Sequence, residues 1–248
     1  MRLDGKTAVV TGGASGFGAG IVEKFLQEGA RVLIADINGE AAKEMAGQSG
    51  PNAVAHKVDV SNGPSVQAMA DAALSAFDHV DILVNNAGIT HLPTPLEDVS
   101  EDDFDRVYNV NMKSVYLTAR ALVPHMKERG AGSILNVAST AGLSPRPNLN
   151  WYNASKGWMI TATKTMAVEL APAGVRVNAI CPVAGETPLL KSFMGEDTPE
   201  VRAKFLSTIP IGRFSTPQDM GNAACFLCSD EAGMITGTAM EVDGGRCI

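Results

Sequence analysis

The amino-acid sequence predicts an α/β fold in which a mostly parallel sheet carries helices on both faces. Short apolar runs alternate along the chain with segments of helical spacing, which is the pattern of repeated strand–helix–strand units. Glycine makes up 25 of the 248 residues, whereas aromatic residues account for only 5%. A chain rich in glycine and aliphatic residues suits a buried parallel sheet with tight turns.

The first half of the chain contains four strand–helix repeats. An apolar run at 7–10 leads into a glycine-rich turn, and apolar residues then recur at helical spacing over 19–28 until Gly29. Further strands are predicted at 32–35, 53–58 and 82–84, and the first two of these end at Asp36 and Asp59. The helices that follow these three strands are predicted at 41–46, 66–77 and 104–125.

The second half continues the same alternation. Strands are predicted at 133–137, 175–180 and 239–242, and the last of these closes the sheet. A long helix at 152–170 ends before Pro172 and Gly174, and an amphipathic helix covers 220–229. No linker or change of composition interrupts the pattern, so we expect one domain over residues 1–248. The polar stretch 186–213, with three prolines, lies outside the pattern and is expected to form a substrate lid.

Charge and hydropathy exclude several classes of partner. The formal net charge of −7 argues against nucleic acid or an anionic membrane surface, both of which attract basic patches. The sequence contains no apolar run of the length that crosses a membrane, and its first residues lack the apolar stretch of a signal peptide. We therefore expect a cytoplasmic protein whose four cysteines are reduced.

Two of the cysteines, Cys225 and Cys228, form a CxxC motif. A zinc site needs four ligands, and no second pair or nearby histidine completes this one. Both sulfurs fall on the apolar face of the predicted helix at 220–229, so we expect core thiols, with redox or metal chemistry as the alternative. No metal site is predicted.

The turn after the first strand indicates a dinucleotide site. Gly12, Gly16 and Gly18 lie between a strand and a helix, where glycines let a pyrophosphate approach the backbone and the helix N-terminus attracts its charge. Asp36 ends the next strand at the spacing expected for an acid that binds the adenosine ribose. A carboxylate there repels a 2′-phosphate, and Ser15 and Ile37 supply no cation to offset it. NAD is therefore predicted over NADP; the alternative for Asp36 is a turn residue at the strand end.

Four motifs in this order resemble those of the classical short-chain dehydrogenase/reductase family. They are Thr11-Gly12 with Gly16 and Gly18, the acid Asp36, Asn85-Asn86-Ala87-Gly88, and Tyr152-x3-Lys156, and the matching segments cover essentially the whole chain. The resemblance implies a doubly wound, Rossmann-type sheet of about seven strands with the cofactor at its carboxyl edge. It also implies a homotetramer joined through the two long helices and the C-terminal segment.

The resemblance assigns a catalytic set. Tyr152 and Lys156 share one helix face, and a cation beside a phenol lowers its pKa, so Tyr152 is expected to exchange a proton with substrate. Ser139 is expected to hold the substrate oxygen, and it is the unambiguous choice because Ala138 stands where many relatives have a second serine. Ser144 is the weaker rival. Asn111 is expected to complete a proton relay, with Asn109 as the alternative register.

Cofactor contacts are expected from the strand-end turns. The predicted residues are Gly12, Ser15, Gly16, Phe17, Gly18, Asp36, Ile37, Asp59, Val60, Asn86, Ala87, Gly88, Tyr152, Lys156, Pro182, Val183, Gly185 and Thr187. The chain departs from the family after the sixth strand, where Val183 replaces the usual glycine and Gly185 follows two residues later. That departure leaves the contacts of this loop open.

The substrate is expected to be a small molecule. Candidate lining residues are His91, Leu92, Arg146, Asn148, Asn150, Trp151, Glu186 and Leu189, a set that favours a polar or oxygenated compound. The sequence thus predicts an NAD-dependent dehydrogenase of a small secondary alcohol, polyol or sugar. The alternatives are a 3-oxoacyl-thioester reductase and, less favoured, a catalytically inactive cofactor-binding scaffold.

Overall fold

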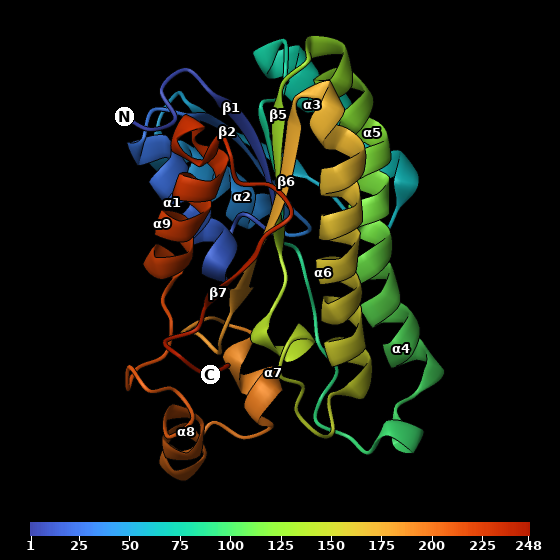
Figure 1. The fold of residues 1–248 in the computed structure, drawn as a ribbon, viewed down its shortest axis with the longest axis vertical. Helices are drawn as coiled ribbons and strands as arrows, with labels where there is room; N and C mark the ends of the chain where they lie inside the picture. Colours follow the sequence, from blue (N-terminus) through green and yellow to red (C-terminus); the bar gives the residue numbers. More distant parts are fainter.

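Seven parallel strands form one sheet in the computed structural model, which describes residues 1–248 (Figure 1). The strands are β1 (Thr7–Thr11), β2 (Arg31–Asp36), β3 (Ala53–Lys57), β4 (Ile82–Asn85), β5 (Gly132–Val137), β6 (Val175–Pro182) and β7 (Ala239–Val242). Their spatial order is β3-β2-β1-β4-β5-β6-β7, and every neighbouring pair is parallel. The chain therefore builds the sheet outward from β1 to β3 and then continues on the other side of β1, from β4 to β7. This change of direction creates a switch point at the carboxyl edge, between β1 and β4.

Helices cover both faces of the sheet, as predicted. One face carries α1 (Gly16–Gln27), α2 (Gly39–Ser49) and α9 (Pro217–Cys228). The other carries α3 (Gly63–Phe77), α4 (Glu101–Tyr108), α5 (Ser114–Arg129) and α6 (Asn150–Leu170). The short helices α7 (Leu190–Met194) and α8 (Pro199–Leu206) lie beyond the carboxyl edge (Figure 1). Single 3-10 turns complete the structure at η1 (Leu96–Asp98), η3 (Thr140–Gly142), η4 (Ala171–Ala173) and η5 (Asp230–Ala232).

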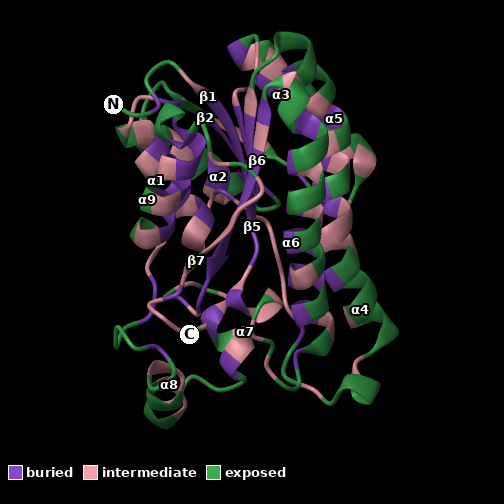
Figure 2. Cartoon of the chain, in the orientation of Figure 1, coloured by how far each residue is buried: buried purple, intermediate pink, exposed green.

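Alternation along the strands divides the core into two layers. In β1, Ala8 and Val10 pack toward α1 and α9, whereas Val9 packs toward α3 and α5. The central strands are buried on both faces, and the helices are buried only where they meet the sheet (Figure 2). This double coverage explains why the strands are nearly continuous runs of apolar residues.

The seven predicted strands are confirmed, and the helices between them begin earlier than predicted. Capping residues account for the earlier starts: the Asn62 side chain accepts from Ser65 N at 3.0 Å before α3, and Thr216 and Asp219 form a capping box at the start of α9. The predicted single helix at 104–125 is wrong in detail. It is α4 followed by the π-helical turn η2 (Asn109–Lys113) and then α5. The helices α7 and α8 lie within the predicted lid stretch. They were not predicted, because its polar residues and prolines interrupt the helical spacing of apolar residues.

None of the helices has both the length and the hydropathy that a membrane span requires.

Cys225 and Cys228 belong to the core beneath α1 and α9. Both are buried, both are free thiols, and both pack in the apolar layer that α1 and α9 form on the sheet. Burial raises the pKa of the Cys228 thiol to about 12 and also raises that of Cys225. Because the thiolate is the reactive form, this environment makes both sulfurs inert.

We expect at most one of the four cysteines, the partly exposed Cys247, to react quickly with a disulfide reagent near about pH 8. All four thiols should react after unfolding in guanidinium, which serves as the control. Mass spectrometry of the labelled peptides identifies the residues. Rapid labelling of Cys225 and Cys228 in the native protein would contradict the assignment of both residues to the core.

Candidate active site

A cavity of about 450 Å³ opens at the carboxyl edge of the sheet. It collects residues that are far apart in the chain, because the carboxyl ends of parallel strands meet at one edge. Gly12 follows β1, Asp36 ends β2, Asn86 follows β4, Ser139 follows β5 and Pro182 ends β6. The cavity therefore lies across the switch point between β1 and β4.

The turn after β1 is shaped to hold an anionic group. Gly12 and Gly16 have φ of +60° and +54°, values that side chains other than glycine rarely adopt. At Gly18 a Cβ would overlap the Gly12 carbonyl, so α1 can approach the turn only with glycine there. The Ser15 side chain makes no capping hydrogen bond at the start of α1. Backbone N–H groups of the first turn are thus left for a ligand such as a pyrophosphate.

Asp36 lies at the far end of the same cavity. One carboxylate oxygen accepts from Ala14 N at 3.0 Å and the other from Asn38 N at 2.9 Å. These two bonds hold the buried carboxylate in the cavity wall beside Ile37. Asp59 and Val60 continue the wall after β3. This end presents a carboxylate and apolar surface and no cation.

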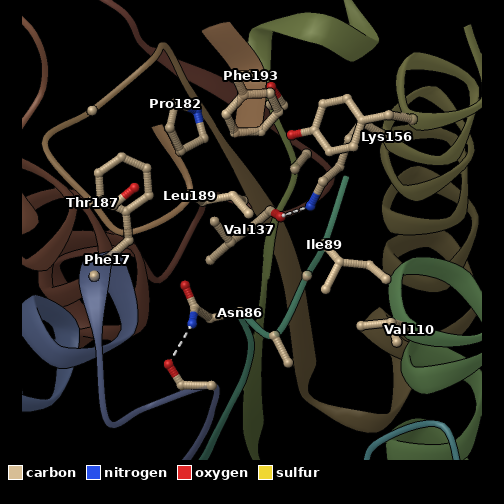
Figure 3. A pocket seen from close by; sticks show the side chains of 18 of the residues that line it. Phe17, Asn86, Ile89, Val110, Val137, Lys156, Pro182, Thr187, Leu189 and Phe193 are labelled. Atoms are coloured by element: carbon tan, nitrogen blue, oxygen red, sulfur yellow. Dashed lines mark hydrogen bonds between the residues drawn. The ribbon is translucent and has the colours of Figure 1, made fainter. Parts of the chain in front are cut away.

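Asn86 joins the two strand ends at the switch point. Its side-chain amide donates to the carbonyls of Thr11 and Gly12 at 2.9 and 3.0 Å (Figure 3). The Thr11 hydroxyl in turn accepts from the backbone N–H groups of Asn86 and Ala87 at 3.0 and 3.1 Å. The glycine turn and the turn after β4 are therefore held in one geometry.

Tyr152 and Lys156 approach the other end of the cavity from α6. The Lys156 amine donates to the Val137 carbonyl at 2.8 Å and lies 5.9 Å from the centre of the Tyr152 ring (Figure 3). Ser139 follows β5 on the same wall, and its hydroxyl accepts from Ala141 N at 3.1 Å. One strand end and one helix thus bring a hydroxyl, a phenol and an amine together.

Burial dominates the electrostatics of this pair. It raises the pKa of Tyr152 to about 12, against smaller lowering effects of the Ser139 hydroxyl and Arg146. Burial also lowers the pKa of the Lys156 amine to about 8. The sequence led us to expect that Lys156 lowers the pKa of Tyr152. In the protein alone the groups that lower the pKa of Tyr152 are Ser139 and Arg146, not Lys156, and burial outweighs both because a low-dielectric site disfavours the charged form.

Asn111 is fully buried in the π-helical turn, beneath the cavity wall. Its amide donates to Ile89 O and to Ser155 Oγ, at 2.9 and 3.0 Å, and its carbonyl accepts from Ile89 N at 2.9 Å. Asn109, the alternative register, is half-buried and makes no side-chain hydrogen bond. The geometry favours Asn111 for a role that couples the turn after β4 to α6.

Packing contacts in the loop after β6 explain why its sequence departs from the family pattern. Val183 is buried and packs with Leu190 and Phe214 in a small apolar cluster under the lid stretch. Gly185 is in direct contact with the Phe17 ring, where a Cβ has no room. Valine is therefore compatible with position 183, and a side chain at 185 would have to displace the Phe17 ring. Thr187 lies against Gly16, so this loop closes over the glycine turn.

Almost all predicted site residues line the cavity; the exceptions are Gly18 and Asn111, which lie directly behind its wall. The substrate candidates fared less well, because only Arg146 and Leu189 line it. The candidates that do not are His91, Leu92, Asn148, Asn150, Trp151 and Glu186. The lining is thus less polar than predicted.

Sequence reasoning missed two aromatic residues of the lid stretch. Phe193 packs edge-on against Tyr152, with ring centres 5.1 Å apart, and Phe205 lies under the Arg146 guanidinium at 4.3 Å. Neither residue belongs to a motif, and their approach depends on how α7 and α8 fold back. Ile89 and Ala138, which also line the cavity, adjoin recognised motifs and could have been found from their positions.

No group of three or more His, Cys, Asp or Glu side chains is arranged to hold a metal ion.

Comparisons with known proteins find relatives over nearly the whole chain. Residues 12–246 match a family model described as Enoyl-(Acyl carrier protein) reductase. The 4-formylbenzenesulfonate dehydrogenase of Comamonas testosteroni is 50% identical, with 100% of both chains covered. D-threitol dehydrogenase of Mycolicibacterium smegmatis is 40% identical, over 100% of this chain and 95% of the relative.

A solved structure is similarly close. The 3-ketoacyl-(acyl-carrier-protein) reductase from Brucella melitensis, in complex with NADH, superposes with a TM-score of 0.94 at 52% identity, covering 99% of this chain and 100% of the other. Fold, motif order and these full-length likenesses agree, and the chain belongs to the classical short-chain dehydrogenase/reductase family of oxidoreductases.

Proposed function

We propose that this protein is a cytoplasmic, NAD-dependent dehydrogenase that interconverts a small secondary alcohol, polyol or sugar and its carbonyl form. The observation that carries this proposal is the convergence of Ser139, Tyr152 and Lys156 on the same cavity that Gly12 and Asp36 line. A proton-transfer group and a dinucleotide cradle in one cavity suit hydride chemistry. Relatives named as dehydrogenases of an aldehyde and of a polyol support it.

The cradle fits NAD better than NADP. The buried Asp36 carboxylate is held in place by two backbone N–H groups and can accept from the hydroxyls of an adenosine ribose. A 2′-phosphate would meet this negative charge, and Ile37 beside it offers no compensation. The neighbouring reductase that was solved with NADH supports the same choice.

The protein's own residues supply position and proton transfer. When bound, the nicotinamide supplies the hydride acceptor or donor. The Tyr152 hydroxyl exchanges the proton of the substrate oxygen, and the Ser139 hydroxyl orients that oxygen beside it. Lys156, fixed on Val137 O, favours the phenolate when it is protonated and can bind the nicotinamide ribose. Asn111 holds α6 through its hydrogen bond to Ser155, and this bond helps to position Tyr152 and Lys156 in the cavity.

A 3-oxoacyl-thioester reductase is the second candidate. The name of the Brucella melitensis relative favours it, and that relative binds NADH, so Asp36 alone does not exclude it. A catalytically inactive scaffold is less favoured, because the complete Ser, Tyr and Lys set faces the cavity.

The functional unit is proposed to be a homotetramer. Four aromatic side chains remain partly exposed on α4, α5 and α6, which lie together on one face (Figure 1). These residues are Phe104, Tyr108, Tyr116 and Trp158. Large exposed aromatic side chains on adjacent helices are typical of a subunit interface.

Replacing Tyr152 by Phe should lower kcat by about 10²–10⁴-fold, because the proton-exchanging hydroxyl is lost. NADH binding, followed by quenching of tryptophan fluorescence, should stay within about threefold of the wild type. Phe keeps the buried ring and its contact with Phe193, so the fold is expected to persist. Substantial dehydrogenase activity in this variant would overturn the assignment.

Replacing Asp36 by Asn should shift the preference for NAD over NADP by at least about tenfold, since a repulsive charge is removed while an acceptor oxygen remains. The measurement is the ratio of kcat/KM for the two cofactors with one alcohol. Asp59→Asn, an exposed acid of the same cavity wall, is the control and should change the ratio little. Wild-type enzyme that prefers NADP would refute the cofactor proposal.

A substrate screen separates the candidate functions. We expect NADH formation or consumption with small alcohols, polyols, sugars or their carbonyl forms. A signal restricted to 3-oxoacyl thioesters would establish the second candidate. Absence of hydride transfer with every compound, despite NADH binding, would favour the scaffold.

Light scattering should give a mass about four times the 25.9 kDa of the subunit. Substituting Tyr116 and Trp158 by charged residues should reduce that mass without changing the secondary structure seen by circular dichroism. A monomeric wild-type protein would disprove the tetramer.

A further inference from the structure

We propose that Arg146 is an anion-binding residue of the substrate cavity and that the substrate carries a carboxylate or sulfonate on an apolar, flat body. This inference rests on the proposed dehydrogenase function, and it assigns an anionic aromatic alcohol or carbonyl compound in place of the secondary alcohol, polyol or sugar named there. The starting observation is a positive charge in the cavity, on Arg146, that has no acidic partner.

Arg146 is a cavity-lining residue whose guanidinium has no acidic partner. It lies in the loop between η3 and α6, where its backbone carbonyl accepts from Asn153 Nδ2 at 2.7 Å. Its side chain makes no ion pair and no hydrogen bond, and its guanidinium lies over the ring of Phe205. Other arginines of this region differ: Arg202 pairs with Asp197 and Glu186, and Arg213 pairs with Asp219.

The surroundings of Arg146 add positive charge. Burial lowers the pKa of its guanidinium, and the nearby Arg246 lowers it further. Arg246 has a buried Nε without a hydrogen-bond partner and forms no ion pair. The acid in that tail, Asp243, accepts from the backbone of Gly245 and Cys247 instead. The remaining groups that interact with Arg146, Tyr152 and Cys247, are neutral in their ordinary protonation states.

Opposite charges occupy opposite ends of the cavity. Its four charged lining residues are Asp36, Asp59, Arg146 and Lys156. Asp36 ends β2 and Asp59 follows β3, at one edge of the sheet. On the far side of the switch point, Lys156 lies against Val137 of β5, and Arg146 lies in the loop that precedes α6. The substrate end therefore holds two cations and no carboxylate. Such a site attracts an anion, and an arginine fork binds a planar oxyanion through two hydrogen bonds.

The walls between Arg146 and Tyr152 describe the rest of the substrate. Phe193, Phe205, Leu149 and Leu189 line this end and present aromatic or aliphatic surface. Phe193 lies on Tyr152 and Phe205 lies on Arg146, so both functional groups are packed by the lid stretch. A ligand with a reactive oxygen at Tyr152, an apolar middle and an oxyanion at Arg146 satisfies all three parts of the cavity.

Equilibrium binding tests this proposal without turnover. The probes are 4-(hydroxymethyl)benzoate and its neutral isostere 4-(hydroxymethyl)benzamide, titrated calorimetrically into the protein saturated with NADH. Wild-type protein should bind the benzoate at least about 30-fold more tightly than the benzamide. In Arg146→Gln the two affinities should become equal, and benzamide binding should persist, which shows that the cavity is intact. Arg146→Lys should restore part of the preference, because charge returns without the fork.

Lys204→Gln is the matched control. It removes a positive charge from α8, next to Phe205, at an exposed residue outside the cavity, and it should leave the preference unchanged. Equal binding of both probes to the wild type, or an unchanged preference in Arg146→Gln, would overturn the proposal. The proposed function is tested independently of the anion site. If binding depends on the charge of the probe but no alcohol or carbonyl compound changes the NADH signal, the anion site is retained and the dehydrogenase function is rejected.

Discussion

Hydrogen bonds between the turn after β1 and the turn after β4 are the constraint on which the site depends. Thr11 and Asn86 exchange backbone and side-chain bonds across the switch point, where crossovers leave the sheet in opposite directions. The cavity lies at this point of the carboxyl edge. The same bonds set the position of Gly12, and through Gly18 they set how closely α1 approaches. The anion-binding turn is therefore a consequence of the topology as much as of its glycines.

Low polarity at the other end of the cavity has two opposed effects. It disfavours ionisation of Tyr152 and Lys156, which moves their pKa values apart, to about 12 and about 8. It also strengthens each interaction with a charge that develops during the reaction, because little solvent screens it. The Val137 carbonyl and the Ser139 hydroxyl are fixed by strand β5 and do not need to reorganise. The site thus disfavours the ionised forms of Tyr152 and Lys156 at rest, although proton transfer there requires charge to develop.

The lid stretch links substrate shape to the catalytic pair. Phe193 and Phe205 come from two short helices that pack on a small apolar cluster of their own, which includes Val183 and Ile209. One ring contacts the tyrosine and the other contacts the arginine, so the lid stretch packs against both groups. Gly244 and Gly245, close to the C-terminus, pack on residues 209–211 and support the same segment from behind. The aromatic residues that contact Tyr152 and Arg146 therefore come from a part of the fold that carries no cofactor motif.

Sequence alone determined the features that depend on local pattern. The alternation of apolar runs and helical spacing predicted all seven strands, and the motifs at Gly12, Asp36, Asn86 and Tyr152 predicted nearly every residue on the cofactor side of the cavity. These predictions succeed because the strand ends of a parallel sheet must meet at one edge. Tertiary structure alone decided the π-helical turn that buries Asn111, the contact of Gly185 with the Phe17 ring, and the apolar character of the substrate end. Those features arise from contacts between segments far apart in the chain, and packing there outweighs any local pattern in the residues.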